Sequence, residues 1–313
     1  MSEHELLLPQ VTEENICLPL AISAVSKYWN VNLPISEARD IAKKYPNVRG
    51  SILVEGLELA ERHGLGSLIL HSNTRELKKI IDMGIPPIVI LPGIYETVQH
   101  ASVISGYDEK ERTILHYIPQ HDQIGVIPEQ QFEKLWEEDG NLAIILAPAD
   151  IISTIHLDSK SKEKSNRLCF VSEKLNLQGK QEEAISTLKE AITLDVTNST
   201  AMCLLGGIYN EKNSQECVNF YEKSIEINKK CYLAYRGLGN YYLKTKQYDS
   251  ADLYYSKAID INESRFGPIY KNRGLVNMAL NKNNQAKIDF EKYLKYTPNA
   301  KDHDAIIEAI KEM

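Results

Sequence analysis

Hydrophobic positions in two segments of the first half of the chain predict one helix and one strand. In LPQVTEENICLPLAISAVSKYW at 8–29, apolar residues recur at helical spacing from Cys17 onward. In VQHASVISGYD at 98–108, apolar and β-branched residues follow one another, which is typical of a strand. We expect Cys17 in the first turn of the helix and His100 at the start of the strand.

The second half of the chain repeats one helical pattern with a period of 33 to 35 residues. Each period carries two small residues seven positions apart, such as Ala251 and Ala258, and the later periods add a Gly and an aromatic residue upstream. Small residues at this spacing lie on one helix face and let a paired helix approach closely. The periods are residues 165–198, 199–231, 232–266 and 267–299. Beyond Pro298, apolar residues alternate with charged ones, which predicts a helix that covers the last repeat.

Composition places the chain among ordinary globular proteins. Its 313 residues are 43% hydrophobic and 25% charged, which suits two domains with ample cores. No apolar stretch approaches the ~20 residues of a membrane span, and the first residues lack the features of a signal peptide. The five cysteines form no disulfide framework. We therefore expect a reduced, cytoplasmic protein without a membrane span.

Charge is divided unevenly between the two halves. Residues 1–150 carry 12 basic and 22 acidic side chains, which leaves 24 and 21 of the chain's 36 and 43 for residues 151–313. An acidic first domain argues against nucleic acid as its partner and favours a basic peptide or protein ligand by electrostatic steering. The alternative is a solvated acidic surface without a charged partner.

Cys17, His100 and Gln10 together supply the parts of a cysteine-nucleophile site. The thiolate is the nucleophile, and a helix N-terminus or a neighbouring imidazolium lowers the thiol pKa from about 8.5. The Gln10 amide and the Cys17 backbone N–H are candidate donors to an oxyanion. The alternative is a small buried cysteine and a histidine satisfied at a strand edge.

The other histidines give no metal site. His63, His71, His116 and His121 have no cysteine or carboxylate at metal-ligand spacing, so we interpret them as structural or solvated. We expect neither a metal nor another cofactor.

A series of motifs occurs in one order along the first half of the chain. It comprises Gln10, Cys17, Gly50 with Ser51, GIPPIVIL at 84–91, His100 followed by SGYDE at 105–109, IPEQQFEKLW at 127–136 and NLAIILAP at 141–148. In these motifs the chain resembles the papain-like cysteine peptidases that remove double-glycine leader peptides from bacteriocins, and the wider peptidase-like group around them. The resemblance implies a papain-like α+β fold, with Cys17 as the nucleophile, His100 as the proton carrier and Gln10 at the oxyanion. It also implies a preference for small residues before the scissile bond.

Two positions depart from that family. Leu18 follows the nucleophile, where the family usually has Gly, and a larger side chain there narrows the cleft. Ile118 precedes Pro119, where the family usually has an Asp that orients the imidazole. Ile accepts no hydrogen bond, so the candidates for that role are Tyr117, Gln120 or Asp122, unless the site works as a dyad.

The period in the second half resembles the tetratricopeptide repeat, a helix–turn–helix unit of about 34 residues. This implies an all-α superhelix whose groove holds a protein partner. The domains expected are a papain-like domain at 1–150, a linker at 151–164, and four repeats with a capping helix at 165–313.

The function expected is that of a cysteine peptidase acting on a peptide or protein substrate, with the repeats recruiting the substrate or a partner. The alternative is a catalytically inactive peptidase-like domain that recognises a peptide on a repeat scaffold. Leu18 and Ile118 favour that alternative, whereas Gln10, Cys17 and His100 together favour catalysis. Acyl transfer through the same thioester is a third class, which the sequence does not separate from hydrolysis.

Overall fold

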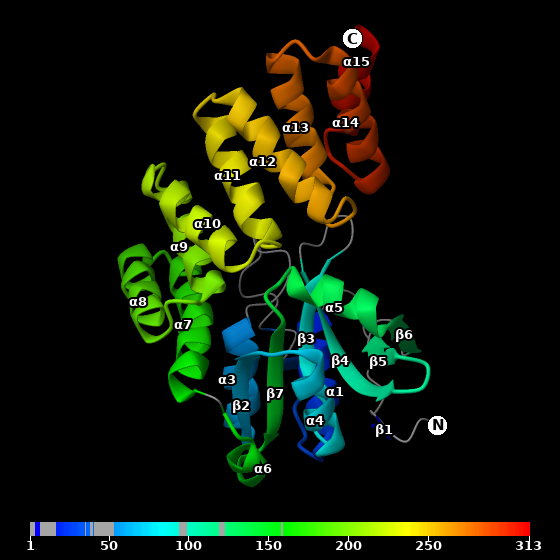
Figure 1. The fold of residues 1–313 in the computed structure, drawn as a ribbon, viewed down its shortest axis with the longest axis vertical. Coiled ribbons are helices and arrows are strands. Elements are labelled where there is room, and N and C mark those ends of the chain that lie inside the picture. Colours follow the sequence, from blue (N-terminus) through cyan, green and yellow to red (C-terminus); the bar gives the residue numbers. More distant parts are fainter. Residues whose placement is uncertain are drawn as a thin grey trace. The chain divides into compact units, whose positions relative to one another are not determined.

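The structure, a computed structural model, describes residues 4–6, 17–34, 36–37, 40, 53–93, 99–118, 123–157 and 159–313. The chain divides into two compact units, of which the first includes residues 100–201 and the second includes residues 202–313. Figure 1 labels the helices and strands of both units. An α+β unit with one sheet is followed by a long run of helices, which confirms the expected fold class.

The first unit is built on one sheet with the strand order β2-β7-β3-β4-β5-β6, and β1 pairs with β4. Antiparallel pairing joins β2 to β7, β3 to β7, β4 to β5 and β5 to β6. The strands are β1 (His4–Glu5), β2 (Leu65–His71), β3 (Ile88–Pro92), β4 (Gln99–Asp108), β5 (Thr113–Ile118), β6 (Gln123–Pro128) and β7 (Leu142–Pro148). Among the described strands, β2 and β6 are therefore the two ends of this strand order, and β1 lies off it.

Helices cover both faces of this sheet (Figure 1). On one face, α1 (Cys17–Tyr28) and α3 (Leu53–Arg62) share a core with β2, β4 and β7. On the other face, α4 (Thr74–Asp82) and α5 (Glu129–Glu137) share a second core with β3, β4 and β5. A short helix, α6 (Ala149–Thr154), follows β7 directly. The two faces of β4 are thus buried by different helices.

The next helix pair, α7 (Lys160–Leu177) and α8 (Gln181–Leu194), belongs to the first unit. Asn166 of α7 is 3% exposed and donates from Nδ2 to the carbonyl oxygen of Ile69 at 2.9 Å. Arg167 donates to the carbonyl oxygen of Ser67 at 2.9 Å and to its Oγ at 2.7 Å. Because β2 is an edge strand, these side chains supply partners to backbone groups that the sheet leaves open.

Ion pairs and one aromatic side chain extend this contact to the helix layer. Lys174 pairs with Glu58 of α3 at 2.7 Å, and Arg167 pairs with Glu61 at 3.0 Å. Phe170 packs against the core that α1 and α3 share. In Figure 1, α7 lies beside α3 and β2. The helix expected to open the repeats therefore also closes one edge of the sheet.

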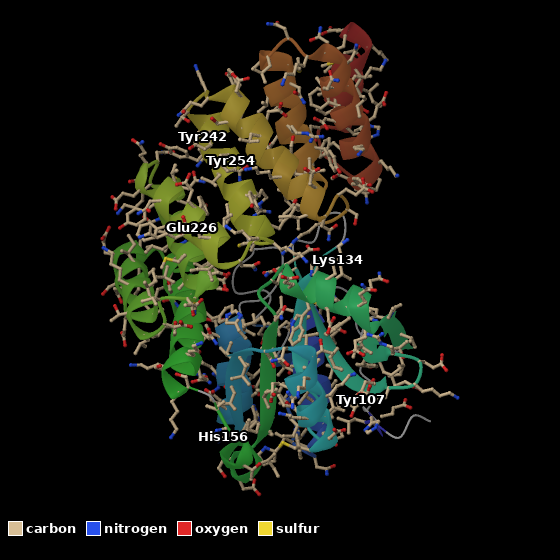
Figure 2. The ribbon with its side chains drawn as sticks, viewed as in Figure 1. Tyr107, Lys134, His156, Glu226, Tyr242 and Tyr254 are labelled. Carbon is tan, nitrogen blue, oxygen red and sulfur yellow. The ribbon has the colours of Figure 1, made fainter. Side chains whose placement is uncertain are left out.

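The helices of the second unit follow one another as a series of helical hairpins. They are α9 (Ser199–Glu211), α10 (Glu216–Ile227), α11 (Tyr232–Lys244), α12 (Tyr248–Ile261), α13 (Pro268–Ala279), α14 (Asn283–Tyr296) and α15 (His303–Glu312). Tyr242 of α11 and Tyr254 of α12, both labelled in Figure 2, stack with ring centroids 5.5 Å apart. Ile306 of α15 is 8% exposed and packs in the core that α12 and α14 share.

One Gly–aromatic contact recurs in three successive hairpins. A Cβ at Gly206, Gly239 or Gly274 would lie 2.8, 2.5 or 2.6 Å from the ring of an aromatic residue on the following helix. Those rings belong to Tyr221, Tyr255 and Phe290. Only glycine lets the two helices approach this closely, which is why the periodic glycines of the sequence mark the repeats.

Candidate functional site

Cys17 is the first residue of α1, as the sequence predicts. Its Sγ accepts a hydrogen bond from the backbone N–H of Ala101 at 3.5 Å, which joins two segments 84 positions apart. Ala101 follows His100 on β4. Because one peptide unit separates that nitrogen from the Cα of His100, the sulfur lies within about 6 Å of that Cα. The structure therefore brings the nucleophile segment and the histidine segment together.

Helix α1 holds Cys17 beside β4 because nearly all the helix residues that follow Cys17 are buried. Leu20, Ala21, Ala24 and Val25 are at most 3% exposed and pack against the sheet. Leu18 is 6% exposed and belongs to the same core. Its side chain therefore packs in the interior of the first unit, and the narrowing of a cleft beside the sulfur stays a prediction.

The electrostatics of the site differ from those expected for a helix N-terminus. Burial raises the pKa of the Cys17 thiol, and the hydrogen bond from Ala101 opposes that shift only in part. Burial lowers the pKa of His100, and the nearby His116 adds to the shift. Both shifts favour the neutral forms. An unprotonated imidazole is the form of histidine that can accept a proton.

Ser102 and His116 form a contact beside the histidine that the sequence did not reveal. Ser102 Oγ donates to the carbonyl oxygen of Tyr117 at 3.1 Å and lies 3.1 Å from His116 Nδ1. Because the Ser102 hydrogen is used, its oxygen accepts from His116 Nδ1–H, an assignment made from the hydrogen-bond pattern. His116 lies over Gly125 of β6, where a Cβ would be 2.4 Å from Nε2.

A sequence signal for this contact exists. Residues 100 and 102 alternate along one strand and so share a face. This face continues onto β5, where His116 pairs with Ile104, and the bond with Ser102 agrees with the interpretation of His116 as structural. Burial lowers the pKa of His116 as well, so its ring is held neutral.

Of the three candidates for orienting His100, the structure describes only one. Tyr117 is 3% exposed, and its side chain packs in the core that α1 and α3 share. Gln120 and Asp122 lie outside the described residues, and so does the predicted oxyanion residue Gln10. The motif residues Gly50 and Ser51 and the prolyl position Pro119 also lie outside them. The distance from Cys17 Sγ to a ring nitrogen of His100 stays a prediction.

Other chemistry is sparse in the described part of the chain. There, no three His, Cys, Asp or Glu side chains gather in a way that could hold a metal ion. All five cysteines are free, and Cys169, Cys203, Cys217 and Cys231 are buried. Among the helices that the structure describes, none has the length and hydropathy to cross a bilayer.

Comparison with protein families matches both halves of the chain. Residues 6–144 match the Peptidase_C39 like family. Residues 234–265 and 268–300 match the tetratricopeptide repeat. Anaphase-promoting complex subunit 3 of Schizosaccharomyces pombe is 34% identical over 96 residues, a match that covers 30% of this chain and 14% of that protein. The chain thus spans only a small part of that curated relative.

Two solved structures are similar to parts of the chain. Pseudomonas aeruginosa pilF is 19% identical with a TM-score of 0.44, covering 49% of this chain and 69% of that one. A double glycine motif protease from an AMS/PCAT transporter, in complex with the leader peptide, is 18% identical with a TM-score of 0.37. That match covers 48% of this chain and 97% of the protease chain.

Proposed function

The chain joins a Peptidase_C39-like domain to tetratricopeptide repeats, and from this premise we propose that it is a cysteine peptidase whose repeats recruit the substrate or a partner protein. The observation that carries the proposal is the hydrogen bond from Ala101 to Cys17 Sγ. It places the only cysteine that is not buried against the start of the strand that carries His100.

The chemistry follows from the protonation states of the two residues. Neutral His100 accepts the proton of the Cys17 thiol as the sulfur attacks the substrate carbonyl carbon. The oxyanion accepts hydrogen bonds from the Cys17 backbone N–H and from the Gln10 amide. When the C–N bond breaks, the imidazolium gives its proton to the leaving amine and a thioester remains on Cys17. Water then attacks the thioester, His100 again takes the proton, and the acid product leaves with the thiol restored.

A binding role without catalysis is the second candidate, because one observation favours it. The raised pKa of Cys17 keeps the sulfur protonated at neutral pH, and the thiol is the weaker nucleophile. Ile118, which holds the position of the family's orienting Asp, also favours the binding role. In that case the first unit recognises a peptide and leaves it intact.

Two measurements separate the candidates. A set of peptides with small residues before the scissile bond is incubated with the full chain, and cleavage is followed by mass spectrometry. Cys17→Ala and His100→Gln should each abolish cleavage, while Cys169→Ala, which replaces a buried cysteine of α7, serves as the matched control. A thioester adduct of the acyl fragment on Cys17, trapped at acid pH, identifies the intermediate.

The alternative has its own signature. If the peptides bind the wild-type chain and Cys17→Ala with equal affinity and no product or adduct forms, the peptidase proposal fails and the binding role stands. Replacing Ile118 with Asp then asks whether a lost orienting group explains the inactivity. A gain of cleavage in that variant identifies a site that lacks only its acid.

A further inference from the structure

One core cluster of the second unit holds three thiols. Cys203 of α9, Cys217 of α10 and Cys231 at the start of α11 are all buried and pack in this cluster. A buried cysteine is usually a small apolar residue, and Cys217 fits that description. It occupies the position that Ala251 and Ala286 hold in the next two hairpins. Cys203 and Cys231 differ from it because their side chains bond to each other.

Two hydrogen-bond donors converge on the sulfur of Cys231. The Cys203 thiol donates to it, and this bond together with burial raises the pKa of Cys203 well above its usual range. Ser224 Oγ, also buried, donates to the same sulfur at 3.4 Å. The guanidinium groups of Arg236 and Arg265 are close enough to oppose the rise in the pKa of Cys203. Donors and positive charge around a sulfur favour its thiolate form.

The backbone position of Cys231 acts in the same direction. Cys231 is the N-cap residue of α11, and its side chain makes no capping hydrogen bond. At the end of the preceding period the equivalent residue is Asn198, whose Oδ1 accepts from the backbone N–H of Ala201 at 3.0 Å. Asn is among the preferred N-cap residues, and cysteine is not. The sulfur therefore lies beside the partial positive charge of a helix N-terminus, a setting typical of reactive cysteines.

We propose that Cys203 and Cys231 are a redox-active dithiol that hydrogen peroxide converts to a disulfide. The Cys231 thiolate attacks one peroxide oxygen, so that an S–O bond forms, the O–O bond breaks and the departing hydroxide takes a proton to become water. The Cys203 sulfur then attacks the sulfenic acid on Cys231. The S–S bond forms, the S–O bond breaks, and hydroxide leaves as water with the proton of Cys203. Two electrons pass from the thiols to the peroxide, and a dithiol reductant reverses the reaction by thiol–disulfide exchange.

The disulfide joins two successive hairpins of the repeats. Cys203 lies on the first helix of one hairpin, and Cys231 opens the first helix of the next. A bond between them closes a loop of the chain and restricts the unfolded state, so that the oxidised repeats resist unfolding more than the reduced repeats. The pair lies in the second unit, and the inference does not depend on whether Cys17 is catalytic.

The test uses the full chain with Cys17→Ala, so that the least buried thiol does not consume the peroxide. The folded chain is treated with hydrogen peroxide, its remaining thiols are blocked with N-ethylmaleimide, and it is digested with trypsin without reductant. The three thiols of the cluster fall in separate tryptic peptides, residues 190–212, 213–223 and 231–236. Mass spectrometry should find the first and third peptides joined, and dithiothreitol added before the blocking step should separate them.

Single substitutions separate the two roles. Cys203→Ala removes the second thiol, so the sulfenic acid on Cys231 persists, and dimedone should label peptide 231–236 at least about tenfold more than the Cys217 peptide. In Cys231→Ser, Cys203 should be labelled no more than Cys217. The matched control is Cys217→Ala, which introduces the residue found at the equivalent positions of the next two hairpins and should leave the disulfide unchanged.

Circular dichroism checks that each variant is folded, and if Cys203→Ala unfolds, the peptide map of the chain with both thiols decides alone. A disulfide that forms only when urea is added overturns the proposal, because the folded contact is then not its source. Peptides 190–212 and 231–236 that stay separate after peroxide treatment also overturn it. Equal dimedone labelling of Cys217 and Cys231 in folded Cys203→Ala does the same.

Discussion

Replacing Asn166 with Ala tests whether the helix pair α7–α8 is part of the peptidase-like unit. Asn166 donates to the Ile69 carbonyl oxygen at 2.9 Å and accepts from Asn198 Nδ2 at 3.0 Å. Asn198 keeps a second bond, to Ser165 Oγ at 2.9 Å, whereas the edge carbonyl loses the donor that Asn166 supplies. A buried polar group left unsatisfied costs about 1–3 kcal/mol. We therefore expect the free energy of unfolding of the first unit to fall by about 2 kcal/mol.

Tryptophan fluorescence measures this unit selectively. The chain has 2 tryptophans, Trp29 and Trp136, and both lie in the first unit. Their indole nitrogens donate to the carbonyl oxygens of Leu146 at 2.8 Å and Leu142 at 2.9 Å, both on β7 next to β2. With a urea dependence of about 2 kcal/mol per M, the tryptophan midpoint should fall by about 1 M.

The matched control is Asn277→Ala on α13. Asn277 is also 3% exposed and donates to Asp289 Oδ2 at 3.0 Å, so an amide side chain of equal burial is removed from the second unit. That variant should shift the far-ultraviolet circular dichroism transition and leave the tryptophan midpoint in place. If Asn166→Ala leaves the tryptophan midpoint at its wild-type value, the reasoning is refuted, and the bond from Asn166 to the Ile69 carbonyl oxygen does not stabilise the first unit.

Three further predictions rest on burial and close packing. Because burial raises the pKa of Cys17, its rate of alkylation by iodoacetamide should keep rising above pH ~8.5, and a rate that levels off near neutrality would contradict this. Gly239→Ala should cost about 1–3 kcal/mol in thermal unfolding because its Cβ meets a buried ring at 2.5 Å, whereas Gly207→Ala, with its nearest contact at 3.9 Å, should be neutral or stabilising. Burial lowers the pKa of three histidines of the first unit, among them His71, so the unfolded state binds more protons below pH ~6.5. Stability by tryptophan fluorescence should therefore be full above that pH and fall as the pH is lowered, and equal stability at pH ~7.5 and ~5.5 would exclude this linkage.

Helix and strand positions in the first unit were predictable where one pattern dominates. The apolar spacing after Cys17 gives α1, and the β-branched run after His100 gives β4. The repeats were predictable because small residues and glycines recur at sites where two helices touch, as at Gly239. In each case a local rule and a packing constraint act on the same residues.

The remaining features depend on contacts between distant segments. Asn166 and Arg167 carry no periodic signal, so nothing local indicates that they bond to the backbone of β2. The contact of Ser102 with His116 needs the register of β4 against β5, which the turn between them sets. The direction of the Cys17 pKa depends on how much apolar surface surrounds the sulfur, and burial outweighs the helix terminus there.

The helix pair α7–α8 also fixes where the repeat array can grow. A repeat of about 34 residues inserted or lost behind α8 leaves the bonds from Asn166 and Arg167 to β2 untouched. The same event ahead of α7 would separate those side chains from the strand that they complete. We therefore expect duplication of a repeat to be tolerated behind α8 and not ahead of α7. Chains of this architecture with different numbers of repeats should share α7 and α8 and differ in the helices that follow α8. The partner that the repeats bind can then change while the contacts between α7 and the sheet stay the same.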